Sequence, residues 1–169
     1  MPVDAAEFAT ALRQYAAGVC LLTLQDDIDD VGTTVTSVMS VSAEPPLVAV
    51  GLDADGYPAE LLGDLGRCVL NVLAGRHAIV ASRFASAGRP SARHLLESVP
   101  WTRSAGGAIV LSDALVALDC RLERLVTAGD HVLALLEVDD VPVLNATEPP
   151  LIRLRGRYVD ASGPPLARS

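Results

Sequence analysis

One stretch decides the fold: Val31-Gly32-Thr33-Thr34-Val35-Thr36-Ser37-Val38-Met39-Ser40-Val41-Ser42, then Ala43-Glu44-Pro45-Pro46, then Leu47-Val48-Ala49-Val50-Gly51-Leu52-Asp53. Its first part alternates hydroxyl and aliphatic side chains, which predicts a strand with one buried face and one face of small hydrogen-bonding groups. Proline has no amide hydrogen, so the Pro-Pro pair stops strand pairing. The apolar run that follows predicts a strand buried on both faces.

The density of hydroxyl groups in this stretch has two interpretations, and the residues alone leave both open. The hydroxyl side chains are those of Thr33, Thr34, Thr36, Ser37, Ser40 and Ser42. Small donors on a rigid strand suit a flat ligand with polar edges. Threonine also favours strands because its Cβ is branched, which explains the same residues without any ligand.

The composition predicts one acidic domain with an aliphatic core. The chain has 169 residues, of which 50% are apolar and only 4% aromatic. Its net charge of −8 disfavours nonspecific binding to nucleic acid or to acidic membranes. No segment has the pattern of a secretory leader or the apolar length of a membrane span, which predicts a cytoplasmic location and no membrane partner.

The cysteines and histidines predict neither disulfide bonds nor a metal site. Each cysteine is isolated and lies among apolar residues, as expected of reduced core thiols; they are Cys20, Cys68 and Cys120. The histidines are far apart and show no spacing typical of metal ligands; they are His77, His94 and His131. We expect His77 and His94 on the surface.

An N-terminal helix is predicted by its start signal. Asp4 and Glu7 have the spacing of a capping box, so the helix should begin near residue 5 and end at Gly18. Phe8, Leu12 and Tyr15 then fall on one apolar face.

The remaining chain reads as strands joined by turns, with few helices. Predicted strands cover residues 19–24, 31–42, 47–53, 68–73, 114–126, 131–138 and 151–159. Residues 25–30 form an exposed turn, Asp139-Asp140 is a break, and predicted helices cover residues 58–65 and 76–86. Residues 87–107 are irregular and the tail is frayed. The predicted fold class is mainly β, an antiparallel barrel with peripheral helices.

Motifs spread along the chain resemble those of a known family. They are Phe8 to Leu24 with its Gly18-Val19 step, Gly32 to Ser37, Ser40 to Leu47, Asn71 to Leu73, Arg83 to Ala85, Gly129 to His131, and Leu154 to Tyr158. In this order and spacing they resemble the flavin reductase family, the small reductase components of two-component flavin-dependent monooxygenases. The resemblance implies an FMN-binding split β-barrel of Greek-key type over residues 1–160, with a flexible tail at residues 161–169.

The resemblance also implies a function. Members are homodimers that pass hydride from NADH or NADPH to FMN or FAD, and the reduced flavin then reaches a partner monooxygenase. Hydride transfer between stacked rings needs no protein acid or base, so the protein acts mainly by positioning. Two alternatives stay open: a flavin-binding split-barrel protein with little or no reductase activity, such as a carrier, and an oxidoreductase that uses a deazaflavin.

Site residues follow from the same resemblance. The implied cofactor-binding residues are Thr33, Thr34, Val35, Thr36, Ser37, Ser40, Asp53, Gly56, Arg83 and Phe84. His131 resembles the family histidine placed near the nicotinamide, although a turn histidine held by Asp130 is an equal interpretation. A solvated helical position for Arg83 and a core position for Phe84 also stay open.

Two other features bear on anion binding. Arg153, Arg155 and Arg157 alternate along the last predicted strand and would share one face, where they meet either a phosphate or solvent. The segment Asp53-Ala54-Asp55-Gly56-Tyr57-Pro58 departs from the family pattern, which has serine, threonine and a basic residue there. An acid beside a phosphate repels it, so the sequence predicts weaker phosphate binding unless amides at the following helix start compensate.

Overall fold

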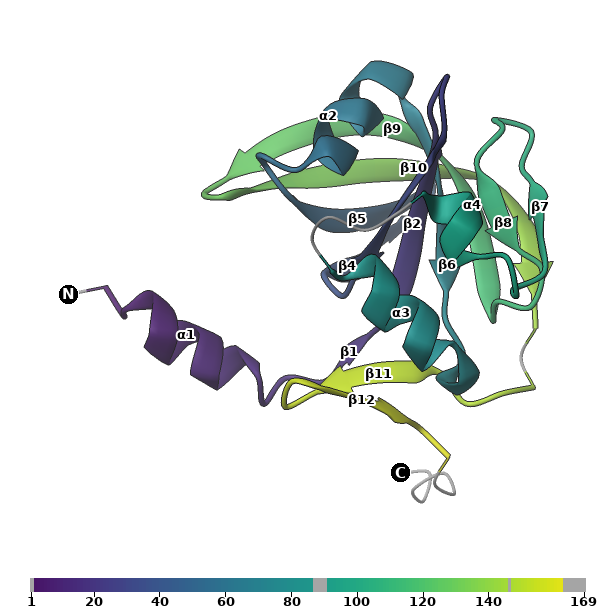
Figure 1. The fold of residues 1–169 in the computed structure, drawn as a ribbon. Helices are drawn as coiled ribbons and strands as arrows, with labels where there is room; N and C mark the ends of the chain where they lie inside the picture. The colour runs from purple at the N-terminus through teal and green to yellow at the C-terminus, as the bar shows by residue number, and fades with distance from the viewer. Residues whose placement is uncertain (1, 87–90, 146, 163–169) are drawn as a thin grey trace.

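A seven-stranded antiparallel sheet forms the body of the protein, of which the computed structural model describes residues 2–86, 91–145 and 147–162 (Figure 1). In spatial order its strands are β3 (Asp30–Val35), β2 (Cys20–Gln25), β6 (Arg67–Val72), β9 (Val116–Ala128), β10 (His131–Leu144), β5 (Pro46–Asp53) and β4 (Val38–Ala43). The expected mainly β, antiparallel architecture is confirmed.

The hydroxyl-rich stretch forms two strands, not the single strand expected from its alternation. β3 and β4 lie at opposite ends of the sheet order, yet only Thr36 and Ser37 separate them in the chain. Two residues span only about 7 Å, so the sheet must curl until its ends meet. The Ser37 carbonyl accepts a 2.9 Å hydrogen bond from the Gly51 amide. A Cβ on Gly51 would lie 3.0 Å from the Ser37 Cβ, so glycine permits this close approach.

Two of the long strands differ from expectation. β10 runs through Asp139-Asp140 to Leu144, because irregular register between Val138 and Asp140 absorbs the expected break. β5 is buried at Ala49, Val50 and Leu52 only, with its other apolar side chains half-buried. The sequence predicted that β5 is buried on both faces, and for a single copy of the chain this prediction was wrong.

Two small sheets flank the barrel. One contains β1 (Ala17–Gly18), β11 (Leu151–Leu154) and β12 (Arg157–Asp160). The single last strand predicted over residues 151–159 is thus a hairpin, since Arg155 and Gly156 both have positive φ and form a turn. The other sheet pairs β7 (Trp101–Arg103) with β8 (Ile109–Leu111).

The helices lie outside the barrel. They are α1 (Ala5–Leu12), α2 (Tyr57–Leu65), the short 3₁₀ helix η1 (Gly75–His77), α3 (Ala78–Phe84) and α4 (Ala92–Leu95). The predicted cap is confirmed, because the Asp4 carboxylate accepts a 2.8 Å hydrogen bond from the Glu7 amide. α1 ends at Leu12, earlier than the predicted Gly18. The region expected to be irregular contains α4 and β7, while residues 87–90 of it and residues 163–169 of the expected tail lie outside the described residues.

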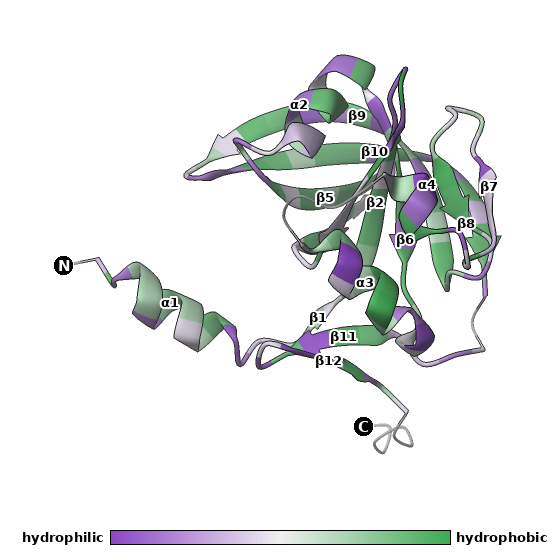
Figure 2. Ribbon diagram, in the orientation of Figure 1, coloured by the Kyte–Doolittle hydropathy of each residue, from purple (hydrophilic) through white to green (hydrophobic). Residues whose placement is uncertain are grey.

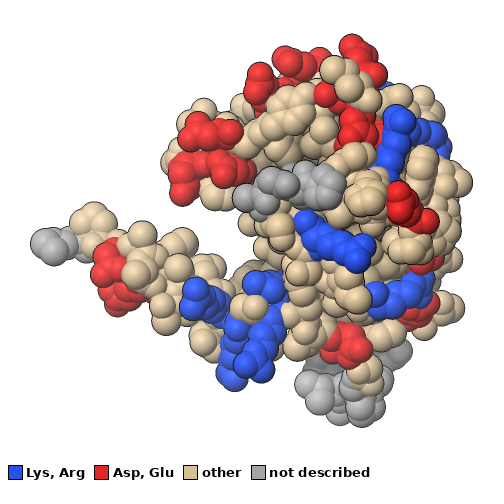
Figure 3. Space-filling view, in the orientation of Figure 1, with Lys and Arg blue, Asp and Glu red and all other residues tan. Residues whose placement is uncertain are grey.

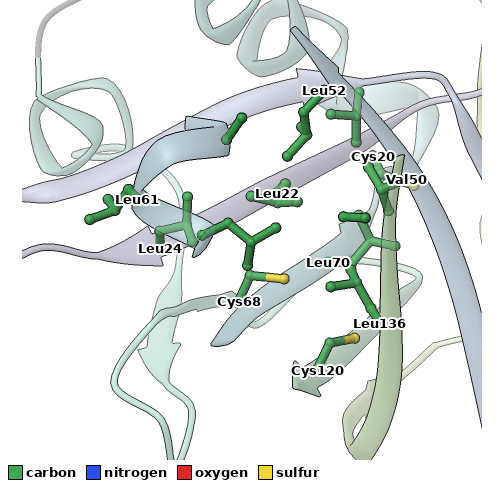
Figure 4. Packing of buried hydrophobic residues seen from close by; sticks show 14 residues of the cluster. Cys20, Leu22, Leu24, Val50, Leu52, Leu61, Cys68, Leu70, Cys120 and Leu136 are labelled. Atoms are coloured by element: carbon green, nitrogen blue, oxygen red, sulfur yellow. The ribbon is translucent and has the colours of Figure 1, made fainter. Parts of the chain in front are cut away.

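The barrel interior is aliphatic, as predicted, and contains the three cysteines (Figures 2 and 4). Leu22, Leu70 and Leu136 meet there beneath α2. All three thiols are free and buried, so the predicted reduced state of the core is confirmed. Burial raises the pKa of Cys20 to about 12, and burial with nearby carboxylates raises the pKa of Cys120 to about 12.

A second core joins α3 and α4 to the outer face of the sheet. Phe84 is 1% exposed, and the Thr34 hydroxyl donates a 2.7 Å hydrogen bond to the Ala81 carbonyl. His77 lies in this layer and is 3% exposed, so its predicted surface position was wrong. Its Nδ1 accepts a hydrogen bond from the Ala74 amide, and burial lowers its pKa. Among the described residues, no helix is long and apolar enough to cross a membrane.

Asp30 is the principal buried carboxylate of this layer, although the sequence predicted an exposed turn there. Its side chain is 0% exposed and accepts hydrogen bonds from Arg93 Nε at 2.6 Å and from both Nη atoms of Arg103. Burial by itself raises the pKa of Asp30, but the hydrogen bonds and positive charges of the two arginines outweigh it and lower the pKa. Through these two arginines, Asp30 therefore links α4 and β7 to the barrel.

Candidate functional site

A cleft of about 570 Å³ opens between α1 and the turn that closes the barrel. Thr36 and Ser37 supply hydroxyl and backbone groups on one wall. The opposite wall is the apolar face of α1, and arginines form the end of the cleft. Figure 3 shows this hollow beside α1, with basic side chains gathered at the base of the helix.

The arginines reach the cleft through the turn between β11 and β12. The Arg155 amide donates to the Arg13 carbonyl at 2.9 Å, and its Nε donates to Gln14 Oε1 at 3.0 Å. Arg153 lies over the Tyr158 ring, with 4.7 Å between the guanidinium carbon and the ring centroid. The sequence predicted that the three arginines share one strand face. This prediction was wrong, because Arg155 lies in the turn. Arg153 and Arg155 nevertheless both line the cleft, where guanidinium groups suit a phosphate.

The residues of the cleft fit a flavin. Ligand pockets of about 300–1,000 Å³ hold small organic ligands, and this cleft lies within that range. Hydroxyl and amide groups of Thr36 and Ser37 complement the polar edge of a flat ring system. The apolar side chains of α1 complement its face, and the arginines complement a phosphate.

Three other predicted site residues meet at the start of α2, in a smaller pocket of about 160 Å³. Thr33 reaches it from β3, Asp53 from the end of β5, and Gly56 from the loop that follows. The Asp53 carboxylate accepts a 3.1 Å hydrogen bond from the Asp55 amide, so it stabilises its own loop. A Cβ on Gly56 would lie 3.1 Å from the Asp53 carbonyl oxygen, which favours glycine there. This acidic pocket is poorly suited to a phosphate.

His131 belongs to the same corner of the molecule. It begins β10 directly opposite Asp53, the last residue of β5. Its Nδ1 lies 2.8 Å from the Asp130 carboxylate, and the side chain is 51% exposed. Hydrogen bonding to His131 lowers the pKa of Asp130. The imidazole is therefore accessible to a ligand while Asp130 orients it.

The remaining predicted residues are dispersed. Val35 faces the barrel core, and the Thr34 hydroxyl and the Phe84 ring are engaged with α3 and β3. In this structure the Thr34 hydroxyl bonds to the Ala81 carbonyl and the Phe84 ring is buried, so their roles in flavin binding stay predictions. Ser40 is exposed on β4, and Arg83 is exposed on α3 beside a separate pocket of about 310 Å³.

Sequence reasoning missed the contribution of α1 to the cleft. Phe8, Leu12 and Tyr15 line it, and none of the residues of α1 is buried. Their helical spacing was visible in the sequence, but spacing alone does not show which surface a helix faces. No group of three or more potential metal-binding side chains occurs within residues 2–86, 91–145 and 147–162.

The fold and cleft together define a class of protein: a split antiparallel barrel with an open cleft at its closing turn, lined by hydroxyl groups, apolar side chains and arginines. The chain belongs to the family of the flavin reductase like domain, whose model matches residues 12–162.

Relatives and solved structures agree with this membership. The chain is 34% identical to the NADH-dependent FMN reductase AsuE2 of Streptomyces nodosus subsp. asukaensis, over 94% of this chain and 85% of that protein. It is 31% identical to the flavin-dependent monooxygenase reductase subunit HsaB of Rhodococcus jostii, over 92% and 77% of the two chains. Its structure is similar to that of BorF, the flavin reductase component of a bacterial two-component tryptophan halogenase, with a TM-score of 0.85, 26% identity, and coverage of 93% and 98%.

Proposed function

We propose that this protein is an NAD(P)H-dependent flavin reductase that supplies reduced FMN or FAD to a partner monooxygenase, and that it acts as a homodimer through its domain of residues 1–160. The observation that carries this proposal is the cleft at the closing turn, where hydroxyl groups, an apolar wall and two arginines converge. Family membership supports the same conclusion.

Each part of the cleft has a role in this reaction. Thr36 and Ser37 would hold the polar edge of the isoalloxazine ring, and Arg153 and Arg155 would hold the phosphate. A bound flavin supplies the ring that accepts hydride from the nicotinamide. The protein contributes binding, orientation and exclusion of water, because hydride transfer between stacked rings needs no protein acid or base.

His131 would position the nicotinamide nucleotide. Its exposed imidazole is oriented by Asp130 at the end of β10. The cleft and His131 both lie near the C-terminal end of β5: Ser37 bonds to Gly51, and His131 pairs with Asp53. Because these two residues of β5 are only two positions apart, one extended ligand complex could contact both.

The direct test is oxidation of NADH or NADPH by the purified chain with FMN or FAD. We expect many-fold acceleration over the same mixture without protein. If no combination of nucleotide and flavin is accelerated, the proposed reductase activity is rejected and a flavin-binding module is favoured. The acidic loop at Asp53 and Asp55 also favours this second function. A deazaflavin as acceptor provides a third arm of the same assay.

Variants of single arginines locate the site. Arg153→Ala should weaken flavin binding about tenfold, since it removes a charge-assisted contact. Arg124→Ala, an exposed arginine of β9, controls for the change in net charge. If Arg83→Ala weakens binding and Arg153→Ala does not, the phosphate lies beside α3 and the proposed position in the cleft is wrong.

A further inference from the structure

One hairpin carries both arginines that line the cleft. It consists of β11, β12 and the turn between them, with Arg153 in β11 and Arg155 in the turn. We call it the arginine hairpin. Pairing of β11 with β1 attaches one side of the hairpin to the rest of the chain.

The chain that enters η1 makes a second attachment to the arginine hairpin. The Leu151 amide donates a 2.9 Å hydrogen bond to the Leu73 carbonyl, and the Gly75 amide donates a 3.0 Å hydrogen bond to the Pro149 carbonyl. The start of η1 therefore determines where this side of the hairpin lies.

The start of η1 is built around the side chain of His77. Its Nδ1 accepts a 3.1 Å hydrogen bond from the amide of Ala74, the residue that precedes the helix. In a capping box a glutamate or glutamine side chain accepts this same bond. Ala74 has no side-chain acceptor of its own, so the buried ring of His77 holds the first turn together.

Only the neutral ring of His77 fits this arrangement. Because Nδ1 accepts a hydrogen bond, the ring hydrogen is on Nε2. Nε2 lies 3.2 Å from Asp113 Oδ1, and neither atom has another hydrogen-bond partner among the described residues. A protonated ring carries hydrogen on both nitrogens, so Nδ1 would then point a hydrogen at the Ala74 amide hydrogen and the bond would be lost.

The charges around His77 do not compensate for this loss. Those on its own helix and on the elements packed against it are Arg76 on η1, Arg83 on α3, Asp113 between β8 and β9, Glu148 before β11 and Asp160 on β12. Asp113 raises the pKa of His77, but it is also paired with Arg76 at 3.3 Å. Burial is the larger effect and lowers the pKa of His77.

We propose that His77 is a positioning residue for the cleft: its neutral ring holds η1 against the arginine hairpin, and protonation of the ring releases this attachment, so that Arg153 and Arg155 move away from the flavin phosphate. His77 itself does not line the cleft. The effect on flavin rests on the proposed function, whereas the coupling between His77 and the hairpin does not.

The direction of the pH dependence follows from the linkage between protonation and attachment. A histidine exposed to water takes up a proton near its ordinary pKa of about 6.5, whereas the buried ring does so only at lower pH. The attachment is therefore fully stable above about pH 6.5 and weakens as the pH falls from there toward the lowered pKa. One proton changes this equilibrium by at most about tenfold for each pH unit.

Amide hydrogen exchange tests the coupling without flavin. NMR should follow the Gly75 and Leu151 amides from about pH 8 to about pH 5, with each rate corrected for the intrinsic pH dependence of exchange. In the wild-type protein the protection of both amides should fall below about pH 6.5, by up to about tenfold per pH unit. His77→Gln should keep its protection, because the glutamine oxygen accepts from the Ala74 amide and does not titrate.

His94→Gln is the matched control, because His94 is exposed on α4, and it should retain the wild-type loss of protection. The wild-type protein also provides a measurement that needs no variant. The nitrogen chemical shifts of His77 should show the tautomer with hydrogen on Nε2, and the ring should become charged only below about pH 6.5. Constant protection in the wild type, an equal loss in His77→Gln, or the opposite tautomer would overturn the proposal.

Fluorescence quenching measures the effect on the cleft, with FMN and with riboflavin, which lacks the phosphate. The FMN dissociation constant should rise below about pH 6.5 more steeply in the wild type than in His77→Gln, by up to about tenfold per pH unit. A phosphate group itself titrates near about pH 6, but it does so equally in both proteins, so their difference isolates His77. Riboflavin should show little difference, since Arg153 and Arg155 bind the phosphate.

Equal FMN profiles in the wild type and His77→Gln would overturn the positioning role of His77. A separate outcome concerns the proposed function. If the arginine hairpin loses protection in acid as expected, but flavin neither binds nor is reduced at any pH, the proposed function fails while the coupling between His77 and the hairpin stands.

Discussion

Asp30 holds the irregular part of the chain to the barrel. Its fully buried carboxylate bonds to Arg93 and Arg103, which lie far along the chain. A buried carboxylate needs such partners because its desolvation is costly. Nothing in the local sequence Asp29-Asp30-Val31 distinguishes this aspartate from its partly exposed neighbours, so its role emerges only from the packing.

We expect Asp30→Asn to lower the free energy of unfolding by about 3 kcal/mol, because it leaves two arginines without their buried counter-charge. Urea denaturation followed by tryptophan fluorescence measures the change. Asp29→Asn is the control, since Asp29 is partly exposed and its contact with Arg93 is longer, at 3.9 Å. Equal losses in the two variants would contradict the assigned role.

The same residue predicts a pH dependence. Its pKa is lower in the folded than in the unfolded protein, so the unfolded state binds more protons as pH falls. The stabilisation is complete above the ordinary aspartate pKa of about 4 and is lost as pH falls through the folded-state pKa. The difference in stability between wild type and Asp30→Asn should therefore shrink below about pH 4; a constant difference would show that charge is not its source.

His131→Ala should raise the KM for the nicotinamide nucleotide about fivefold, as expected for the loss of one hydrogen bond, and should change the flavin KM less. Steady-state kinetics with each substrate varied in turn measures both constants. His94→Ala provides the control, because His94 is exposed on α4 and pairs with Glu97. Equal effects of His131→Ala on both KM values would contradict the proposed role of His131 in binding the nucleotide.

At the scale of elements, the loop between β5 and α2 determines how anions approach the start of a helix. A helix N-terminus attracts anions through its free amides, but Asp53 and Asp55 place negative charge there. The Asp53 carboxylate accepts a hydrogen bond from the Asp55 amide. Asp55 is therefore the acidic residue whose negative charge can be removed by substitution without losing this bond.

Asp55→Ser should therefore increase flavin affinity about threefold, which corresponds to removal of a repulsion of about 0.7 kcal/mol from one exposed charge. Flavin fluorescence quenching measures the affinity, and the increase should decline at high salt. Asp64→Ser, near the C-terminal end of α2, has the same change in net charge and should have a smaller effect. No gain in Asp55→Ser would reject electrostatic repulsion by this loop.

At the scale of the whole molecule, closure of the barrel protects its thiols. Cys68 and Cys120 are register partners on β6 and β9, and Cys20 lies in the same core. Burial disfavours the thiolate, which is the reactive form. A disulfide reagent should modify none of the three thiols rapidly in the native protein and all three in concentrated guanidinium chloride. Rapid labelling of the native protein would show that the barrel opens readily.

Local periodicity determined much of the fold from sequence: the apolar strands, the Asp4 cap, the Gly129 turn and the aliphatic core were all predictable. The motifs from Gly32 to Leu47 also predicted the family. These features depend on residues within a few positions of one another, which is the range over which propensity, capping and alternation act.

Only the tertiary structure decided which of these elements meet. It split the hydroxyl-rich stretch at Thr36 and Ser37, since closing the barrel required a turn there. It also placed Arg155 beside Gln14, 141 positions away in the chain, and so formed the cleft. Such contacts depend on which distant apolar faces bury each other, and that choice is made by the packing of the whole chain rather than by any one segment.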